Sequence, residues 1–314
     1  SIMPYHVRPV ENQVFHAAIV PIGAETYEVS ADPGSYVALS MEGTILGTGL
    51  VGETGTLVFD IEPVTTSGNV TLCVTHPQRI PYLEEIPAAN IDGAFVTIES
   101  YTPSEAHIGA ANDLIIYFKN IGTAWTPSDT YVTLTCDDPN ITFIEDSGDL
   151  GNLPQNEFSA ELYFRYRINA NVADGTRFHI KTTAICETET WESVVNITAN
   201  KAVVEYAGAQ CPGEFVPGET FQIAASFENI GHYVATNANI SISSTSQYIT
   251  FSEEDVAIGS IAPNGIVTAV FNVTIASNCP ESELIPLTFS LMADDDNLAE
   301  GTATLQNTCL VIFD

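Results

Sequence analysis

The sequence predicts an all-β protein of three tandem immunoglobulin-like β-sandwich domains, on the evidence of an internal repeat and of many short strands. Asn229-Ile230-Gly231 repeats Asn120-Ile121-Gly122, and Ile249-Thr250-Phe251 repeats Ile141-Thr142-Phe143, at offsets of 108 to 109 residues. A period of about 100 residues matches a whole β-sandwich domain. Alternating apolar and polar runs, separated by turn residues every 8–12 positions or so, are typical of the same architecture.

The first unit is expected to begin after an irregular segment. Residues 1–13 contain Pro4 and Pro9 and are expected to be a linker from an upstream domain, since the chain starts at Ser1 without Met. Glu42-Gly43 between two apolar runs predicts a tight hairpin turn. Strands are expected at 14–20, 26–31, 36–41, 44–51, 55–61, 69–76 and 80–86.

Two further units are expected to follow, each again with seven strands. In the second unit we expect strands at 95–101, 113–120, 130–136, 141–145, 159–167, 176–186 and 190–198. In the third unit we expect them at 202–207, 220–228, 238–244, 249–251, 267–276, 284–292 and 302–313. The predicted domains are therefore residues 14–88, 89–200 and 201–314.

The composition excludes several classes of partner. The chain has 8 Lys and Arg against 40 Asp and Glu, a formal net charge of −32 and a pI of about 4.1. Such a surface repels nucleic acids and anionic membranes, so we expect neither as a partner. No run of about 18 apolar residues occurs, so no membrane span is expected.

Asn120 and Asn229 stand at the ends of predicted strands. We expect a structural role for them, in which the following glycine takes a positive φ and the Asn amide bonds neighbouring backbone.

The first unit contains three informative runs. They are Thr26-Tyr27-Glu28-Val29-Ser30-Ala31, Tyr36-Val37-Ala38-Leu39-Ser40 and Gly43-Thr44-Ile45-Leu46-Gly47-Thr48-Gly49, followed by 55–59, 69–75 and 79–82. Together they resemble the C-terminal immunoglobulin-like region of gingipain-type cysteine peptidases over residues 1–88. Ser1-Ile2-Met3-Pro4-Tyr5 is similar to the segment that follows the catalytic domain in that family. His76-Pro77-Gln78 departs from the family pattern, which has glycine, tyrosine and asparagine there.

The two later units are similar to another group of modules. Their seven strands and the Asn-x-Gly strand ends resemble CARDB-like immunoglobulin-like repeats of secreted prokaryotic proteins. Taken together, the resemblances imply a non-catalytic spacer, stabilising or surface-interaction module of a secreted or cell-surface cysteine peptidase. The catalytic domain would lie upstream of Ser1, so no catalytic residue is carried over. The implied partners are that domain and protein or glycan surfaces.

The cysteines are candidates for two roles, as nucleophiles and as disulfide partners. Cys73 and His76 are three apart on a predicted strand and so point to opposite faces, and Cys136 precedes two aspartates that would raise its pKa. Cys211 and Cys279 fall in connections expected at one end of a sandwich, which makes a disulfide possible. The alternative is two ordinary buried thiols.

Two further ligand sites are candidates. The run Asp294, Asp295, Asp296 and Asn297 offers oxygen ligands for calcium, the one cofactor we consider, although a solvated acidic turn is the plainer interpretation. Trp125 and Trp191 are candidate ligand-facing aromatics at one tip of the second unit, with core packing as the alternative.

A second functional class stays open beside the peptidase module. The chain is alternatively a cell-surface adhesin or an extracellular filament subunit that binds glycans or copies of itself. The basic residues gather in the second unit, which suggests a charged contact with an acidic neighbouring domain: Lys119, Arg165, Arg167, Arg177 and Lys181. An autonomous hydrolase is not favoured, because no nucleophile, base and orienting group can be assembled.

Overall fold

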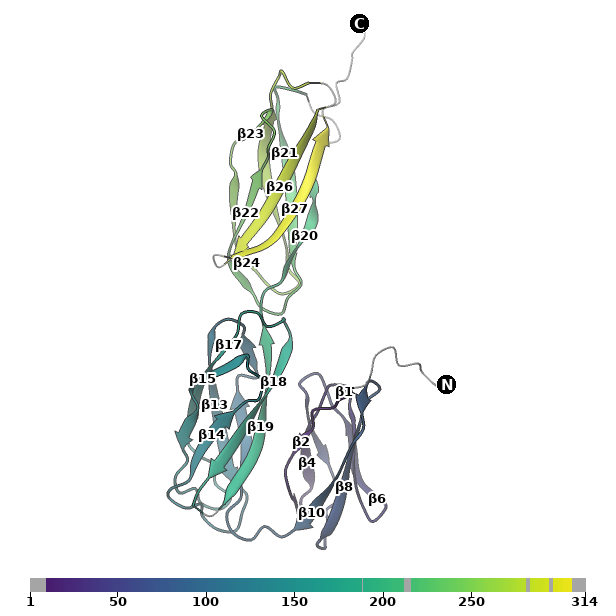
Figure 1. The fold of residues 1–314 in the computed structure, drawn as a ribbon, viewed down its shortest axis with the longest axis vertical. Helices are drawn as coiled ribbons and strands as arrows, with labels where there is room; N and C mark the ends of the chain where they lie inside the picture. Colours follow the sequence, from purple (N-terminus) through teal and green to yellow (C-terminus); the bar gives the residue numbers. More distant parts are fainter. Residues whose placement is uncertain (1–9, 188, 212–215, 281–282, 294–295, 307–314) are drawn as a thin grey trace. The chain divides into compact units, whose positions relative to one another are not determined.

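The computed structural model describes residues 10–187, 189–211, 216–280, 283–293 and 296–306 (Figure 1). Within these residues the chain forms β-strands and no helix, so the all-β prediction is confirmed. The described part holds no helix of the length and hydropathy that a membrane span requires. The chain forms two compact units, Ser1–Val172 with Thr176–Ala199, and Ala173–Gly175 with Asn200–Asp314.

Three separate clusters of buried apolar side chains lie in these units, and each is enclosed by its own sheets. In chain order, the first two clusters lie in the unit Ser1–Val172 with Thr176–Ala199. The third cluster lies in the other unit. We call the surrounding strands the first, second and third sandwich. The domain boundaries at 14, 89 and 201 remain predictions.

The first sandwich packs two sheets around Val29, Leu39 and Leu72. The orders are β3-β10-β8-β5-β6 and β2-β4-β7, and β1 pairs with β9. Its strands are β1 (Val10–Glu11), β2 (Phe15–His16), β3 (Val20–Pro21), β4 (Thr26–Ser30), β5 (Tyr36–Met41), β6 (Thr44–Leu50), β7 (Thr56–Asp60), β8 (Gly68–Thr75), β9 (Arg79–Ile80) and β10 (Tyr82–Ala89).

Two local predictions for this sandwich have different outcomes. Glu42 and Gly43 have φ angles of 49° and 81°, as a type I′ hairpin turn requires, so the turn between β5 and β6 is confirmed. The single strand expected at 14–20 is wrong. β2 pairs with β4 in one sheet and β3 pairs with β10 in the other, so the chain changes sheets between them.

The second sandwich has sheets of order β11-β13-β17-β15 and β12-β19-β18-β14-β16. Its strands are β11 (Val96–Thr102), β12 (Glu105–His107), β13 (Ala111–Asn120), β14 (Tyr131–Thr135), β15 (Ile141–Glu145), β16 (Ser147–Asp149), β17 (Leu162–Ile168), β18 (Thr176–Ile185) and β19 (Thr190–Asn200). β12 and β16 were not expected. Each is a three-residue edge strand, too short to show an alternating apolar pattern.

The third sandwich repeats this arrangement with sheets of order β20-β21-β25-β23 and β24-β22-β26-β27. Its strands are β20 (Val204–Gln210), β21 (Thr220–Asn229), β22 (Ala235–Ser243), β23 (Ile249–Phe251), β24 (Asp255–Ile261), β25 (Ile266–Ile275), β26 (Leu284–Ala293) and β27 (Asp296–Gln306). The first strands of both sandwiches even carry an equivalent irregularity, between Ile98 and Ser100 in β11 and between Tyr206 and Gly208 in β20. The repeat read from the sequence is therefore a repeat of topology.

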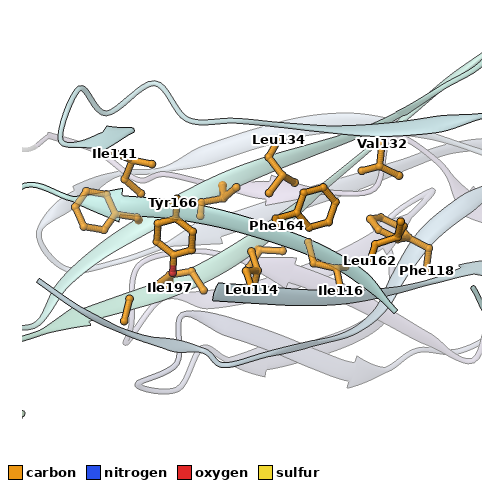
Figure 2. Close-up of a cluster of buried hydrophobic side chains, with 14 of the residues drawn as sticks. Leu114, Ile116, Phe118, Val132, Leu134, Ile141, Leu162, Phe164, Tyr166 and Ile197 are labelled. Carbon is orange, nitrogen blue, oxygen red and sulfur yellow. The ribbon is translucent and has the colours of Figure 1, made fainter. Parts of the chain in front are cut away.

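The core of the second sandwich shows why alternating sequences produce it. Leu114, Ile116 and Phe118 point inward from β13, and Phe164 and Tyr166 point inward from β17 (Figure 2). Each such apolar side chain contributes on the order of 1.5–3 kcal/mol when fully buried. The Tyr166 hydroxyl has no hydrogen-bond partner among the described residues, and burial raises the Tyr166 pKa.

A fully buried asparagine fixes one end of the second sandwich. The Asn120 Oδ1 atom accepts hydrogen bonds from the backbone N–H groups of Phe95 (3.1 Å) and Gly122 (3.0 Å). Its Nδ2 atom donates to the carbonyls of Ala124 (2.7 Å) and Leu153 (3.0 Å). One side chain thus joins three segments of the chain and bonds four backbone groups, among them the Leu153 carbonyl, which also accepts from the Thr126 N–H at 3.0 Å.

Asn229 makes the same set of bonds in the third sandwich. Its Oδ1 accepts from the N–H groups of Val203 (3.2 Å) and Gly231 (3.1 Å), and its Nδ2 donates to the carbonyls of Tyr233 (2.8 Å) and Ile261 (3.0 Å). The expectation that both asparagines bond neighbouring backbone is confirmed.

The role expected for the glycines is wrong. Gly122 and Gly231 do not have a positive φ; they permit a close approach of two backbone segments. A Cβ on Gly122 would lie 2.3 Å from the Gly93 carbonyl oxygen, and one on Gly231 would lie 2.4 Å from the Val203 nitrogen. Any side chain at either position would therefore push the adjoining segment away.

Replacing either asparagine with alanine should destabilise its own sandwich strongly and by a similar amount. Four hydrogen bonds to backbone groups are lost in each case, so we expect Asn120→Ala and Asn229→Ala each to lower the free energy of unfolding by about 3–5 kcal/mol. Calorimetry and urea titration of the full chain measure this, with the exposed Asn171→Ala as the matched control. A loss below about 1 kcal/mol at either position would contradict the assigned role.

Candidate functional site

Within the first compact unit, the first and second sandwiches meet through a buried polar contact around Asn196 of β19. The Asn196 Nδ2 atom donates to Ser30 Oγ and to Thr56 Oγ1, both at 2.7 Å. Ser30 and Thr56 are directly paired on β4 and β7, so the amide bonds one rung of that sheet. Asn196 is 6% exposed, and hence these are desolvated hydrogen bonds between residues 166 and 140 positions apart.

Aromatic and charged groups surround this contact. His179 of β18 places its Nδ1 atom 2.6 Å from Asn196 Oδ1, and its ring lies 4.8 Å from the ring of Phe15 in the first sandwich. The Tyr101 hydroxyl donates to the Asn196 carbonyl at 3.2 Å. Burial lowers the His179 pKa, and the positive charge of Arg177 lowers it further. The hydrogen bond to Asn196 and the negative charge of Asp32 act in the opposite direction and raise it.

One charged pair at this junction fits the expected basic-to-acidic contact. Arg177 Nη2 lies 3.6 Å from Glu53 Oε2 and also donates to the Glu53 carbonyl. The Glu53 side chain is almost fully exposed, so water screens this ion pair and its contribution is small. The buried amide of Asn196 therefore dominates the contact.

A cleft of about 650 Å³ opens beside the junction. Its walls are apolar at Phe15, Val58 and Phe95 and carry carboxylates, among them Glu28. Desolvation by these walls raises the Glu28 pKa, although the side chain stays accessible from the cleft. The walls offer apolar contact and negative charge.

The two candidate tryptophans differ in their exposure to solvent. Trp125, between β13 and β14, is 59% exposed, whereas Trp191 is 8% exposed and packs in the core of the second sandwich. The β18–β19 turn does reach the segment after Trp125, because the Glu187 N–H donates to Asp129 Oδ2 at 3.3 Å. The expectation of a ligand-facing Trp191 is wrong, since its position on β19 points inward.

Exposed aromatics on the outer face of β13 and β17 were not expected. Glu161 accepts hydrogen bonds from the hydroxyls of Tyr117 (2.6 Å) and Tyr163, and these bonds lower the Glu161 pKa. Nearby, Lys119 Nζ lies 4.8 Å from the centre of the Phe158 ring. Strict alternation with the core residues of β17 was the sequence signal that placed Tyr163 outside.

The possible disulfide between Cys211 and Cys279 is not formed. The structure shows Cys211 as a free thiol, and burial raises its pKa. Cys211 packs at the border of the third core, while the Cys279 Sγ atom lies 3.8 Å from the Pro280 carbonyl. Each sulfur therefore packs into its own local environment, as ordinary cysteines do in cores.

Cys73 and Cys136, the two cysteines weighed as nucleophiles, are both partly buried. Cys73 lies within β8 between Ala38 and Leu83, and the His76 Nδ1 atom accepts a hydrogen bond from the Gln78 N–H at 3.1 Å. The Cys136 pKa is raised, first by burial and then by Asp138 and Asp137, although a backbone N–H of Asp138 opposes this. A raised pKa keeps the thiol protonated and poorly nucleophilic.

The calcium candidate cannot be placed. Asp294 and Asp295 lie outside the described residues, and only the backbone of Asp296 and Asn297 is described, in β27. Among the side chains that are described, no three His, Cys, Asp or Glu residues gather as a metal site. The calcium site remains a prediction.

Lowering the pH should weaken the junction through His179. Because its pKa is lowered in the folded chain, the unfolded chain binds a proton more readily below the ordinary imidazole value of about 6.5. Stability from this group is therefore complete above about pH 6.5 and declines as the pH falls towards the folded pKa. The measurement is the Tm of wild type and His179→Gln between pH 7.5 and 5. Parallel decline of the two curves would contradict the role of His179.

Comparison with known proteins gives a partial match. No family model matches the chain. Lys-gingipain of Porphyromonas gingivalis is 32% identical over 136 residues, which is 39% of this chain and 8% of that protein. Lys-gingipain W83 of the same organism is 29% identical over 118 residues, 33% of this chain and 7% of that protein.

A solved structure adds a similar local match. The crystal structure of the Arg specific cysteine proteinase gingipain R has 28% sequence identity and a TM-score of 0.25, over 26% of this chain and 19% of that chain. The chain spans less than a tenth of the length of the curated relatives it matches. By its sequence similarity to Lys-gingipain, part of the chain is a gingipain-related region.

Proposed function

We propose that this chain is a non-catalytic spacer and stabilising module of a secreted or cell-surface, gingipain-related cysteine peptidase. Its first part would be the immunoglobulin-like domain beside the catalytic domain, and the two CARDB-like repeats would extend from it. The catalytic domain would lie upstream in the same precursor. By the names of the relatives, Lys-gingipain and the Arg specific gingipain R, we propose that the parent enzyme cleaves after Lys or Arg.

The observation that carries this proposal is the buried amide of Asn196. It bonds a strand of the second sandwich to a paired rung of the first sandwich. Such a desolvated contact supports a stiff connection between the first and second sandwiches rather than a flexible one. A stiff module next to a catalytic domain holds that domain at a distance and slows its unfolding.

Two measurements on the native protein test this function. Peptide mass spectrometry of the protein from its source should show sequence continuous with Ser1 that forms an α/β cysteine peptidase domain. In that full protein, Asn196→Ala should shorten the half-life of peptidase activity on heating several-fold, from a loss of about 2–3 kcal/mol at the junction, with kcat/KM unchanged. Thr190→Ala, an exposed change on the same strand, is the control. A native protein without a peptidase domain would exclude the proposal.

A second candidate is an adhesin or filament subunit, and exposed aromatics favour it. Trp125, Phe158 and Tyr163 of the second sandwich are all more than half exposed. Aromatic rings of this kind supply contact area for glycans or protein surfaces.

Binding to a glycan panel and sedimentation of the full chain test this candidate. Glycan binding should fall at least about tenfold, on the order of 1.4 kcal/mol, in Trp125→Ala. Val216→Ala, an exposed apolar change in the third sandwich, should leave it unchanged. No binding by wild type, together with a monomer in sedimentation, would exclude both versions.

A further inference from the structure

Lysine and arginine are rare in this chain and are confined to particular places. There are 8 among 314 residues, and Arg8 lies outside the described part. Of the seven in the described part, six are inside β-strands: Arg79 in β9, Lys119 in β13, Arg165 and Arg167 in β17, and Arg177 and Lys181 in β18. The seventh is Lys201, directly after β19.

Most of these residues lie on strands that are bonded on both sides. Lys119 is paired with Thr97 and bridged to Phe158. Arg165 stands between Asp113 and Glu145, and Lys181 stands between Thr135 and Val194. An endopeptidase needs several extended residues with unpaired backbone groups, so such a strand must leave its sheet before it is cut.

The three less protected residues are held in other ways. Arg177 is paired on one side, with Thr198, and its guanidinium contacts Glu53. The Arg79 Nε atom lies 2.6 Å from Asp32 Oδ2, which keeps the guanidinium away from a protease pocket, and Pro81 follows two residues later. The Lys201 N–H donates to Asp174 Oδ1 at 2.7 Å, and its carbonyl accepts from the Tyr233 N–H at 3.3 Å. The backbone at Lys201 is thus bonded on both sides of the side chain.

The described loops of the second sandwich show the opposite composition. Loops 121–130, 150–161 and 186–189 carry exposed aromatic and acidic residues, including Trp125, Phe158 and Glu157, and none of their described residues is Lys or Arg. Exposed loop tips are where proteolytic nicking concentrates. The side chains of these loops are exposed, although part of the loop backbone is bonded, as where the Asn156 N–H donates to the Asn120 carbonyl at 2.7 Å. These loops offer no bond to a protease that requires a basic residue.

We propose that this chain is built to persist beside endopeptidases that cleave after Lys or Arg. The rarity of basic residues and their placement in paired backbone together remove the bonds that such enzymes cut. The advantage of this resistance to the organism rests on the proposed function, in which the chain is linked to a gingipain-related peptidase. The resistance itself is a property of the folded chain and is tested without that enzyme.

The test is limited digestion of the folded full chain with trypsin, scored on the residues after Arg8. We expect the wild type to remain intact at least about tenfold longer than the urea-unfolded chain. A Glu-specific endopeptidase should cut the folded chain in its loops. Rapid tryptic cleavage at any of the seven described basic residues of the folded wild type would overturn the inference.

Two matched variants separate backbone protection from general repulsion by the acidic surface. Gln155→Lys puts a lysine in the exposed 150–161 loop, and Tyr163→Lys puts one on the exposed face of β17, opposite Ile115. We expect trypsin to cut Gln155→Lys at least about tenfold faster than wild type and to leave Tyr163→Lys intact. If Gln155→Lys resists as well as wild type, the placement of basic residues is not the cause. Neither result depends on the proposed linkage to a peptidase.

Discussion

The two buried carboxamides of Asn120 and Asn229 are the constraint on which the repeated sandwiches depend. Each occupies the point where a central strand ends, and each bonds backbone from three segments. A carboxamide is suited to this because it offers two donors and two lone-pair sites in one plane. The glycine two residues later completes the arrangement by letting two backbones touch.

Much of this architecture was predictable, because local sequence patterns determine it. Strand alternation gave the all-β fold, and the 109-residue offset of Asn120 and Asn229 revealed the repeat. The Glu42-Gly43 turn followed from the rare φ angles that a two-residue hairpin demands. The edge strands β12 and β16 escaped prediction, since three residues show no periodicity, and the seven-residue edge strand β24, most of which is exposed or half-buried, was missed as well.

The candidate site was less predictable because its parts are distant in the sequence. The sequence around Asn196 does not predict its contact with Ser30, which lies 166 residues away. Trp125 and Trp191 look alike as residue types, and only the register of β19 turns one of them inward. Cys211 and Cys279 were correctly assigned to loops of one sandwich, but loop membership does not set the sulfur geometry that a disulfide needs.

The extra strand β12 has a mechanical consequence for the second sandwich. It lies in the same sheet as β19, the last strand, and the Thr198 N–H donates to the Ser104 carbonyl at 2.9 Å. The entering and leaving segments of this sandwich are thus hydrogen-bonded to each other. In the described part of the third sandwich, the first strand β20 has a sheet partner only in β21. Under a stretching force, the second sandwich must break these terminal bonds before it extends.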